Sequence, residues 1–233
     1  MDNLILSESV SATSQQIRVQ ERLAIVLALI AGYIDAAGLI KWKTYLSFMS
    51  GNTTQLGTAM SAGQCATIIT STTVIGCFVL GIYFGTCLSL WRKLHTHTLP
   101  FMIVSGMLIL YSIASYYFNI GTILSIAIIG FSMGLMNTIV TAVGNQKVNT
   151  DFVSGTLNSL ARNTAMLSMT KDITERKAYK TNAIHLLLVW MGFLLGAAAA
   201  LFTLPFLGTW ILIVPALVLL ICSLLISILN FNP

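Results

Sequence analysis

Residues 47–63 read SFMSGNTTQLGTAMSAG and contain Ser, Thr, Asn, Gln and Gly but no Lys, Arg, Asp or Glu. The stretch lies between apolar runs in a chain of which 56% of residues are hydrophobic and 8% are charged. Soluble domains carry about 25% charged residues, so this composition is typical of a polytopic membrane protein. The stretch is too polar for an ordinary membrane span and too uncharged for an ordinary surface loop.

A helix needs about 20 largely apolar residues to cross the hydrocarbon core of a bilayer. Six segments meet this requirement: residues 22–40, 66–91, 99–118, 121–143, 182–204 and 206–229. We therefore predict a single membrane domain over residues 22–230, preceded by a polar cytoplasmic N-terminal tail of residues 1–21. The charged segment 171–180 is the other stretch that we expect in water.

The polar stretch is part of an internal duplication. Three pairs of segments match in the same order: FMSGNTTQL at 48–56 with FVSGTLNSL at 152–160, GYIDA at 32–36 with GLMNT at 134–138, and TLPF at 98–101 with TLPF at 203–206. The second pair aligns Asp35 with Asn137. Because the offsets are 104, 102 and 105 residues, we predict two repeats, residues 23–118 and 121–229.

The same motifs resemble those of a known family. G-Y-I-D-A, F-M-S-G-N-T-T-Q-L-G, M-G-L-M-N and V-S-G-T-L-N-S-L-A-R are similar to the YoaK-type family of bacterial multi-pass membrane proteins, and the resemblance covers nearly the whole membrane domain. That family is a domain of unknown function, so the resemblance implies a bacterial inner-membrane location and little about chemistry. The chain departs from it at KWKTY, residues 41–45, where the family often has glycine and apolar residues.

Two topologies are compatible with two repeats. If both polar segments cross the membrane, there are eight crossings and parallel repeats. If each segment dips in and returns, there are six crossings and the second three-span repeat is inverted. With the N-terminus inside, the eight-crossing topology places six Lys and Arg residues inside and five outside, and the six-crossing topology places nine inside and two outside.

The positive-inside rule therefore favours the second topology. The predicted fold class is an all-α polytopic membrane protein. It has six transmembrane helices and two short broken or re-entrant helices, arranged as two inverted three-span repeats with both chain termini in the cytoplasm.

The two broken helices would bring their N-termini toward the membrane midplane from opposite sides. The partial positive charge of a helix N-terminus suits an anion or a polar solute. Each Ser-Gly pair predicts a break followed by a helix start, with nearby hydroxyl and amide groups capping free N–H groups. The candidate binding residues from these segments are Ser50, Gly51, Asn52, Thr53, Gln55, Ser154, Gly155, Thr156 and Asn158.

Two charged residues, Asp35 and Arg162, fall within the predicted membrane elements. Charge inside a membrane is costly and marks a functional site by default. In the functional interpretation Asp35 binds a proton or cation and Arg162 holds an anionic group. In the structural interpretation the two form an ion pair that locks the repeats together. Asn137, the uncharged counterpart of Asp35, completes the candidate site; that only one copy can titrate agrees with proton coupling and equally with sequence drift.

These residues predict a small-solute secondary transporter or channel, with proton coupling through Asp35 as a finer expectation. The alternatives are an intramembrane serine hydrolase, with Ser50 or Ser154 as nucleophile and His185 as base, and a non-transporting membrane scaffold. We expect no enzymatic activity, no cofactor, no metal and no nucleic-acid partner. The expected partners are the lipid bilayer and a small polar or anionic solute, and the sequence is compatible with a homo-oligomer.

Overall fold

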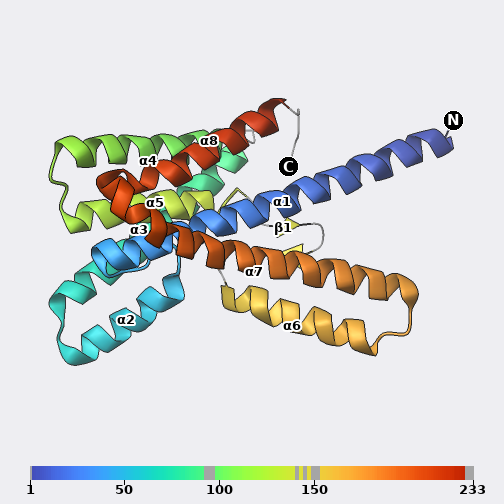
Figure 1. The fold of residues 1–233 in the computed structure, drawn as a ribbon, viewed down its shortest axis with the longest axis horizontal. Coiled ribbons are helices and arrows are strands. Elements are labelled where there is room, and N and C mark those ends of the chain that lie inside the picture. Colours follow the sequence, from blue (N-terminus) through green and yellow to red (C-terminus); the bar gives the residue numbers. More distant parts are fainter. Residues whose placement is uncertain (1, 92–97, 140–141, 144–145, 148–152, 229–233) are drawn as a thin grey trace.

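The structure is a computed structural model that describes residues 2–91, 98–139, 142–143, 146–147 and 153–228, with the backbone alone for residues 2–17, 91, 142–143 and 146–147. In chain order the elements are α1 (Asp2–Trp42), α2 (Met49–Ala62), α3 (Cys65–Trp91), α4 (Leu99–Tyr117), α5 (Thr122–Met136), β1 (Ala142–Val143), β2 (Gln146–Lys147), α6 (Val153–Met169), α7 (Ile173–Leu207), the 3₁₀ helix η1 (Gly208–Leu212) and α8 (Ile213–Ile228). Apart from the two-residue β1–β2 ladder, the described chain is helical (Figure 1).

The two segments predicted to be aqueous are both part of helices. Residues 2–21 of the predicted tail belong to α1, which continues without interruption to Trp42. Residues 173–180 form the first turns of α7, because the Asp172 carboxylate caps that helix by accepting the N–H groups of Thr174 and Glu175. The predicted charged loop is therefore reduced to the turn before Ile173.

By length and composition, four described stretches are able to cross a membrane: Arg18–Trp42, Cys65–Leu90, Leu99–Tyr117 and Ile173–Ile228. The first three agree with the first three predicted spans. The fourth holds both of the last two predicted spans, since Figure 1 shows α7 and α8 running in opposite directions on either side of η1. α5 has 15 residues and rises about 22 Å, less than the predicted span 121–143, because Asn137 ends it. The count of six crossings stays a prediction.

The long helices form two sets of opposite direction. Figure 1 shows α1, α4 and α7 running one way and α3, α5 and α8 the other way. α1 packs along α7, α3 along α5, and α4 against α8. The short helix α2 folds back on α3, and α6 folds back on α7. In the view of Figure 1, α2 and α6 both run outward from the middle, toward opposite ends of the molecule.

The α1–α7 interface depends on two glycines. A Cβ atom at Gly32 of α1 would collide with the backbone of Phe193 on α7. A Cβ atom at Gly196 of α7 would collide with the backbone of Leu29 on α1. Small residues allow helix backbones to approach this closely, which is how membrane helices associate when lipid is as apolar as their side chains.

The α3–α5 interface is built in the same way. A Cβ atom at Gly134 of α5 would collide with the backbone of Phe78 on α3, and one at Gly81 of α3 with the backbone of Phe131 on α5. On each of the four helices, the glycine and the residue contacted by the partner's glycine are three positions apart. The two interfaces are therefore equivalent, with α5 in the place of α1 and α3 in the place of α7.

The short helices also correspond in register. α2 begins at Met49 and α6 at Val153, which are 104 residues apart, the offset of the duplicated motif. The buried residues of α2 are Asn52 and Ala59, and those of α6 are Thr156 and Asn163, at the same offset. The motif that was duplicated thus starts an equivalent helix and buries an equivalent face in each half.

The third sequence match does not mark equivalent places. Residues 98–101 open α4, whereas residues 203–206 lie in the last turns of α7. The buried Leu108 and Ser112 of α4 instead resemble Leu219 and Ser223 of α8, which are 111 residues further on. The TLPF match was wrong as a marker of the repeat, because four residues with two apolar positions recur easily in an apolar chain.

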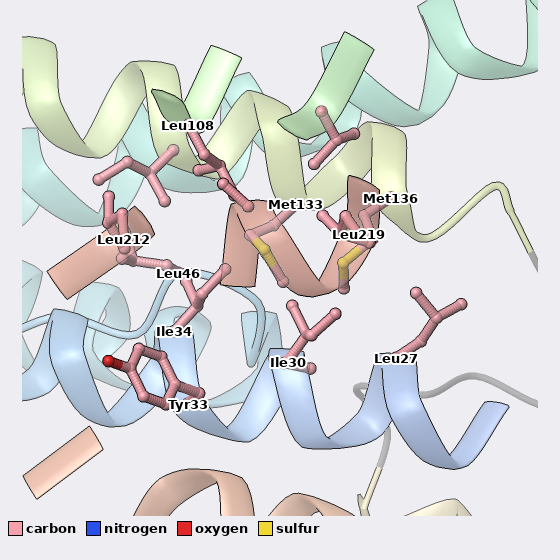
Figure 2. Packing of buried hydrophobic residues seen from close by; sticks show 14 of the residues in the cluster. Leu27, Ile30, Tyr33, Ile34, Leu46, Leu108, Met133, Met136, Leu212 and Leu219 are labelled. Atoms are coloured by element: carbon pink, nitrogen blue, oxygen red, sulfur yellow. The ribbon is translucent and has the colours of Figure 1, made fainter. Parts of the chain in front are cut away.

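The buried core lies where α1 meets α5 and α8 (Figure 2). Figure 2 shows Leu27, Ile30 and Ile34 of α1 facing the Met133 and Met136 side chains of α5. Large apolar side chains on the outer faces are instead exposed, among them Tyr83, Phe84, Leu110, Leu201, Phe202 and Phe206. A surface of this kind is expected when lipid covers the helices.

Candidate functional site: a buried carboxylate and the start of α2

The Asp35 carboxylate of α1 is buried, with 3% of the residue exposed, and binds the loop that follows α1. Its Oδ1 atom accepts the backbone N–H groups of Leu46 and Ser47, each at 2.7 Å, and that of Phe48 at 3.3 Å. Its Oδ2 atom accepts the Ser47 hydroxyl at 2.7 Å. Successive backbone N–H groups that converge on one oxygen form an anion-binding nest, and here the protein's own carboxylate fills it.

The loop reaches Asp35 because the chain turns back sharply after α1. Lys43 has a φ of 58°, in the left-handed region that reverses the chain direction. Gly38 leaves room for the returning loop, since a Cβ atom there would lie 2.7 Å from the Leu46 side chain and 2.8 Å from the Thr44 carbonyl oxygen. Leu46 is fully buried in the core, so its packing holds the loop against α1.

Asn52 holds the same loop from the other side. Its Oδ1 atom accepts the Thr44 hydroxyl at 2.9 Å and the Tyr45 N–H group at 3.2 Å, and its Nδ2 atom donates to the Tyr45 carbonyl at 2.8 Å. Asn52 is completely buried. Its amide is therefore hydrogen-bonded to the loop, and its predicted role as a neutral ligand stays a prediction.

α2 starts one residue earlier than the predicted break. The helix begins at Met49, and the N-cap residue Phe48 makes no side-chain cap. The Thr53 hydroxyl bonds back to the Met49 carbonyl at 2.8 Å, so it does not cap the helix either. In the described chain, the backbone N–H groups of Ser50 and Gly51 have no hydrogen-bond acceptor. The first turn of α2 thus keeps two free donors.

The remaining residues of the first candidate segment lie around this turn. Ser50 and Thr53 are exposed, and Gln55 is half-buried. Gly51 packs against an aromatic pair, since a Cβ atom there would lie 2.6 Å from the Phe48 ring and 2.9 Å from the Tyr45 ring. The structure therefore brings Asp35, Asn52 and the start of α2 together.

The candidate residues of the second repeat lie apart from Asp35. Ser154, Asn158 and Arg162 are exposed on α6, Gly155 is half-buried and Thr156 is buried. Asn137 is half-buried and caps the C-terminus of α5. Asp35 and Arg162 form no ion pair: every partner of Asp35 within the described residues lies between Leu46 and Phe48. The contacts therefore do not support the structural interpretation, in which an ion pair between these two residues locks the repeats together.

The loop residues that hold Asp35 were not predicted from the sequence. Leu46, Ser47 and Phe48 supply the contacts, and Gly38 supplies the space. One signal was present, because the polar stretch KWKTY lies shortly before the duplicated motif. Two further bonds fix the end of α1: Tyr33 donates to the Ile211 carbonyl at 3.1 Å and Lys41 to the Gly208 carbonyl at 3.0 Å.

Taken together, the length and composition of the apolar helices indicate a helical membrane protein, in which a returning loop binds a buried carboxylate. The chain belongs to the family described as "Protein of unknown function (DUF1275)", whose model matches residues 23–225. No curated protein and no solved structure matches it significantly. A family of unknown function agrees with the expectation from the sequence, and the YoaK-type name stays a resemblance compatible with it.

Proposed function

We propose that this protein is a small-solute secondary transporter or channel of the bacterial inner membrane, built from two inverted repeats. The observation that carries the proposal is the pair α2 and α6, two short helices that start at equivalent residues in two halves with opposite directions. Inverted repeats with interrupted helices whose ends lie near the midplane are a recurring plan of transporters.

The helix directions support the six-crossing topology. In that topology the first, third and fifth crossings run outward, and these are α1, α4 and α7, which share one direction in Figure 1. The second, fourth and sixth are α3, α5 and α8, which share the other. α2 and α6 then return to the side from which they entered, as re-entrant helices, and both chain termini lie in the cytoplasm.

The solute site is placed at the first turn of α2, with its counterpart at the first turn of α6. The free N–H groups of Ser50 and Gly51 and the partial positive charge of the helix favour a polar or anionic group. Asp35 lies beside this turn, and its negative charge would repel an anion. The N-terminus of α2 therefore suits a neutral polar group. Arg162 is exposed on α6 nine residues after Val153, so it does not belong to the first turn of that helix.

Asp35 offers a route to proton coupling. As a carboxylate it holds three N–H groups and one hydroxyl of the loop before α2. A proton on Asp35 would weaken these bonds, since a neutral carboxyl group is a poorer acceptor, and the start of α2 would be released from α1. Asn137 has no ionisable group, so only one repeat would respond.

The hydrolase alternative gains no support from the contacts. His185 lies on α7 and lines a cavity with residues of α1, whereas Ser50 lies on α2, which packs on α3. Ser154 is exposed on α6, which packs on α7, but the His185 Nε2 atom has no hydrogen-bond partner among the described residues. We therefore propose transport without enzymatic activity.

The first test compares the tips of the two helical hairpins. Cys65 is exposed at the tip of the α2–α3 hairpin, and Met169, 104 residues later, is exposed at the tip of the α6–α7 hairpin. In a background without Cys77, Cys87 and Cys222, an impermeant maleimide should label Cys65 in intact cells. A Met169→Cys protein that also lacks Cys65 should be labelled only after the membrane is permeabilised.

The permeabilised sample is the control, because both cysteines must react there. Labelling of both tips from the same side would mean that the repeats are parallel, and the inverted-repeat proposal would fail.

The second test measures flux. Purified protein in liposomes should raise the permeability to at least one of glycerol, urea, formate and acetate above that of empty liposomes. Osmotic swelling followed by light scattering measures the flux of glycerol and urea, and an internal pH-sensitive dye measures that of formate and acetate. Asp35→Asn should remove the pH dependence of this flux, whereas Asp172→Asn, a change of an exposed acid at the start of α7, should preserve it. If the cysteine labelling supports inverted repeats but the flux of all four solutes equals that of empty liposomes, transport of small polar or anionic solutes is contradicted.

A further inference from the structure

A cavity of about 270 Å³ lies between α1 and α7, at the polar end of the first candidate span. Its lining residues are Arg18, Glu21, Arg22, Ile25, Thr181, Ile184, His185 and Leu188. The cavity lies between α1 and the early turns of α7, whereas the Asp35 site lies in the last turns of α1 before Trp42. It is thus a separate site, and its interpretation does not depend on the transport proposal.

The two arginines of the cavity have no partner among the described residues. Arg18 and Arg22 are one helical turn apart on α1, so their side chains share a face. Neither forms an ion pair or a side-chain hydrogen bond with any residue that the structure describes, although Glu21 also lines the cavity. Two guanidinium groups on one cavity provide the planar donors that bind phosphate oxygens.

His185 supplies an independent sign of a missing ligand. The residue is 7% exposed, and its Nε2 atom is buried without a hydrogen-bond partner. A buried polar atom without a partner costs about 1–3 kcal/mol, so such atoms are rare in native structures. Glu21, which also lines the cavity, acts on His185 through its charge.

The apolar side of the cavity indicates where the phosphate comes from. Ile184 and Leu188 line the cavity and are 49% and 47% exposed, on the outer face of a helix within a candidate span. A free phosphate ion would leave this apolar surface uncovered, whereas the acyl chain of a lipid would cover it. Basic pockets between membrane helices near the cytoplasmic surface bind anionic lipid headgroups.

We propose that this cavity binds the phosphate group of a phospholipid at the membrane surface, with Arg18 and Arg22 on the phosphate and Ile184 and Leu188 along an acyl chain. Glu21 then faces the part of the headgroup beyond the phosphate. It favours a headgroup with hydrogen-bond donors, such as glycerol hydroxyls or an amine.

The test is native mass spectrometry of the full-length protein, titrated with phosphatidylglycerol after delipidation. The wild-type protein should retain one lipid at a concentration about tenfold below that needed by Arg18→Gln/Arg22→Gln. The control Arg176→Gln/Lys180→Gln removes two exposed basic residues of α7 that do not line the cavity, and should bind like the wild type. Arg18→Lys/Arg22→Lys, which keeps the charge but not the planar donors, should fall between.

Each outcome decides the proposal. Equal lipid binding by the wild type and Arg18→Gln/Arg22→Gln would overturn it, provided that both elute as a single folded species. An equal loss in Arg176→Gln/Lys180→Gln would also overturn it, because the effect would then be one of general charge. Millimolar inorganic phosphate should not displace the retained lipid; displacement would assign the cavity to a soluble phosphate compound in place of a membrane lipid.

Discussion

An Asp35→Ala protein is expected to lose the attachment of α2 to α1. The change leaves the N–H groups of Leu46, Ser47 and Phe48 and the Ser47 hydroxyl without their acceptor. Each unsatisfied buried donor costs about 1–3 kcal/mol, and non-additivity within one cluster reduces the sum, so we expect a loss of about 3–6 kcal/mol. The thermal unfolding temperature in detergent should fall accordingly. Amide hydrogen exchange at residues 44–52 should accelerate at temperatures where the rest of the protein is still folded.

A graded series separates the bonds of Asp35 from its charge. Asp35→Asn keeps one acceptor oxygen for the backbone N–H groups and should be destabilised less than Asp35→Ala. Ser47→Ala removes a single hydroxyl bond and should cost about 1 kcal/mol. If the amide hydrogen exchange and the unfolding temperature of Asp35→Ala equalled those of the wild type, the packing of Leu46 alone would hold the loop. The proposal that a proton on Asp35 releases α2 would then have no basis.

The second large effect is expected at the glycines of the two equivalent interfaces. A methyl group at Gly32 or Gly134 would collide with the backbone of Phe193 or Phe78. Overpacking a well-packed core costs about 1–3 kcal/mol, and a backbone obstacle cannot move aside as a side chain can, so we expect the upper end or more. Thermal unfolding of Gly32→Ala and Gly134→Ala, followed by size-exclusion chromatography, measures the loss.

Gly106→Ala is the matched control. Gly106 lies on α4, and a Cβ atom there would meet nothing within 4 Å. The change should be neutral or stabilise the helix by up to about 1 kcal/mol. Since the interfaces are equivalent, Gly32→Ala and Gly134→Ala should lose similar amounts. A loss confined to one of them would show that the two halves do not contribute alike.

The duplicated motif predicted more of the fold than any other part of the sequence. The match of residues 48–56 with 152–160 places the first residues of α2 and α6 and the buried faces of both helices in the right register. A motif with this effect is specific because its glycine and small polar residues meet local backbone demands. TLPF lacked that specificity. Residues 171–180 were predicted to be a loop because they are charged, although the residues after the Asp172 N-cap include good helix formers.

The partners of Asp35 could not be predicted in the same way. Asp35 was singled out by its charge within a span, but three of its four bonds are to backbone N–H groups, which every residue except proline possesses. Their location depends on the reversal at Lys43 and the space at Gly38. Arg162 looked like a partner because it is the other charge, although it lies exposed on α6.

The exchange of helices between the two repeats has a consequence for biosynthesis. α1 packs along α7 and α3 along α5, so the main contacts of α1 are made with the second half of the chain. At 5–20 residues per second, α1 leaves the ribosome roughly 10–30 s before the part of α7 that covers Gly32. During this interval its glycine face meets lipid or an insertion factor. Neither half is therefore expected to be stable when synthesised alone, whereas two halves expressed together from separate messages should assemble.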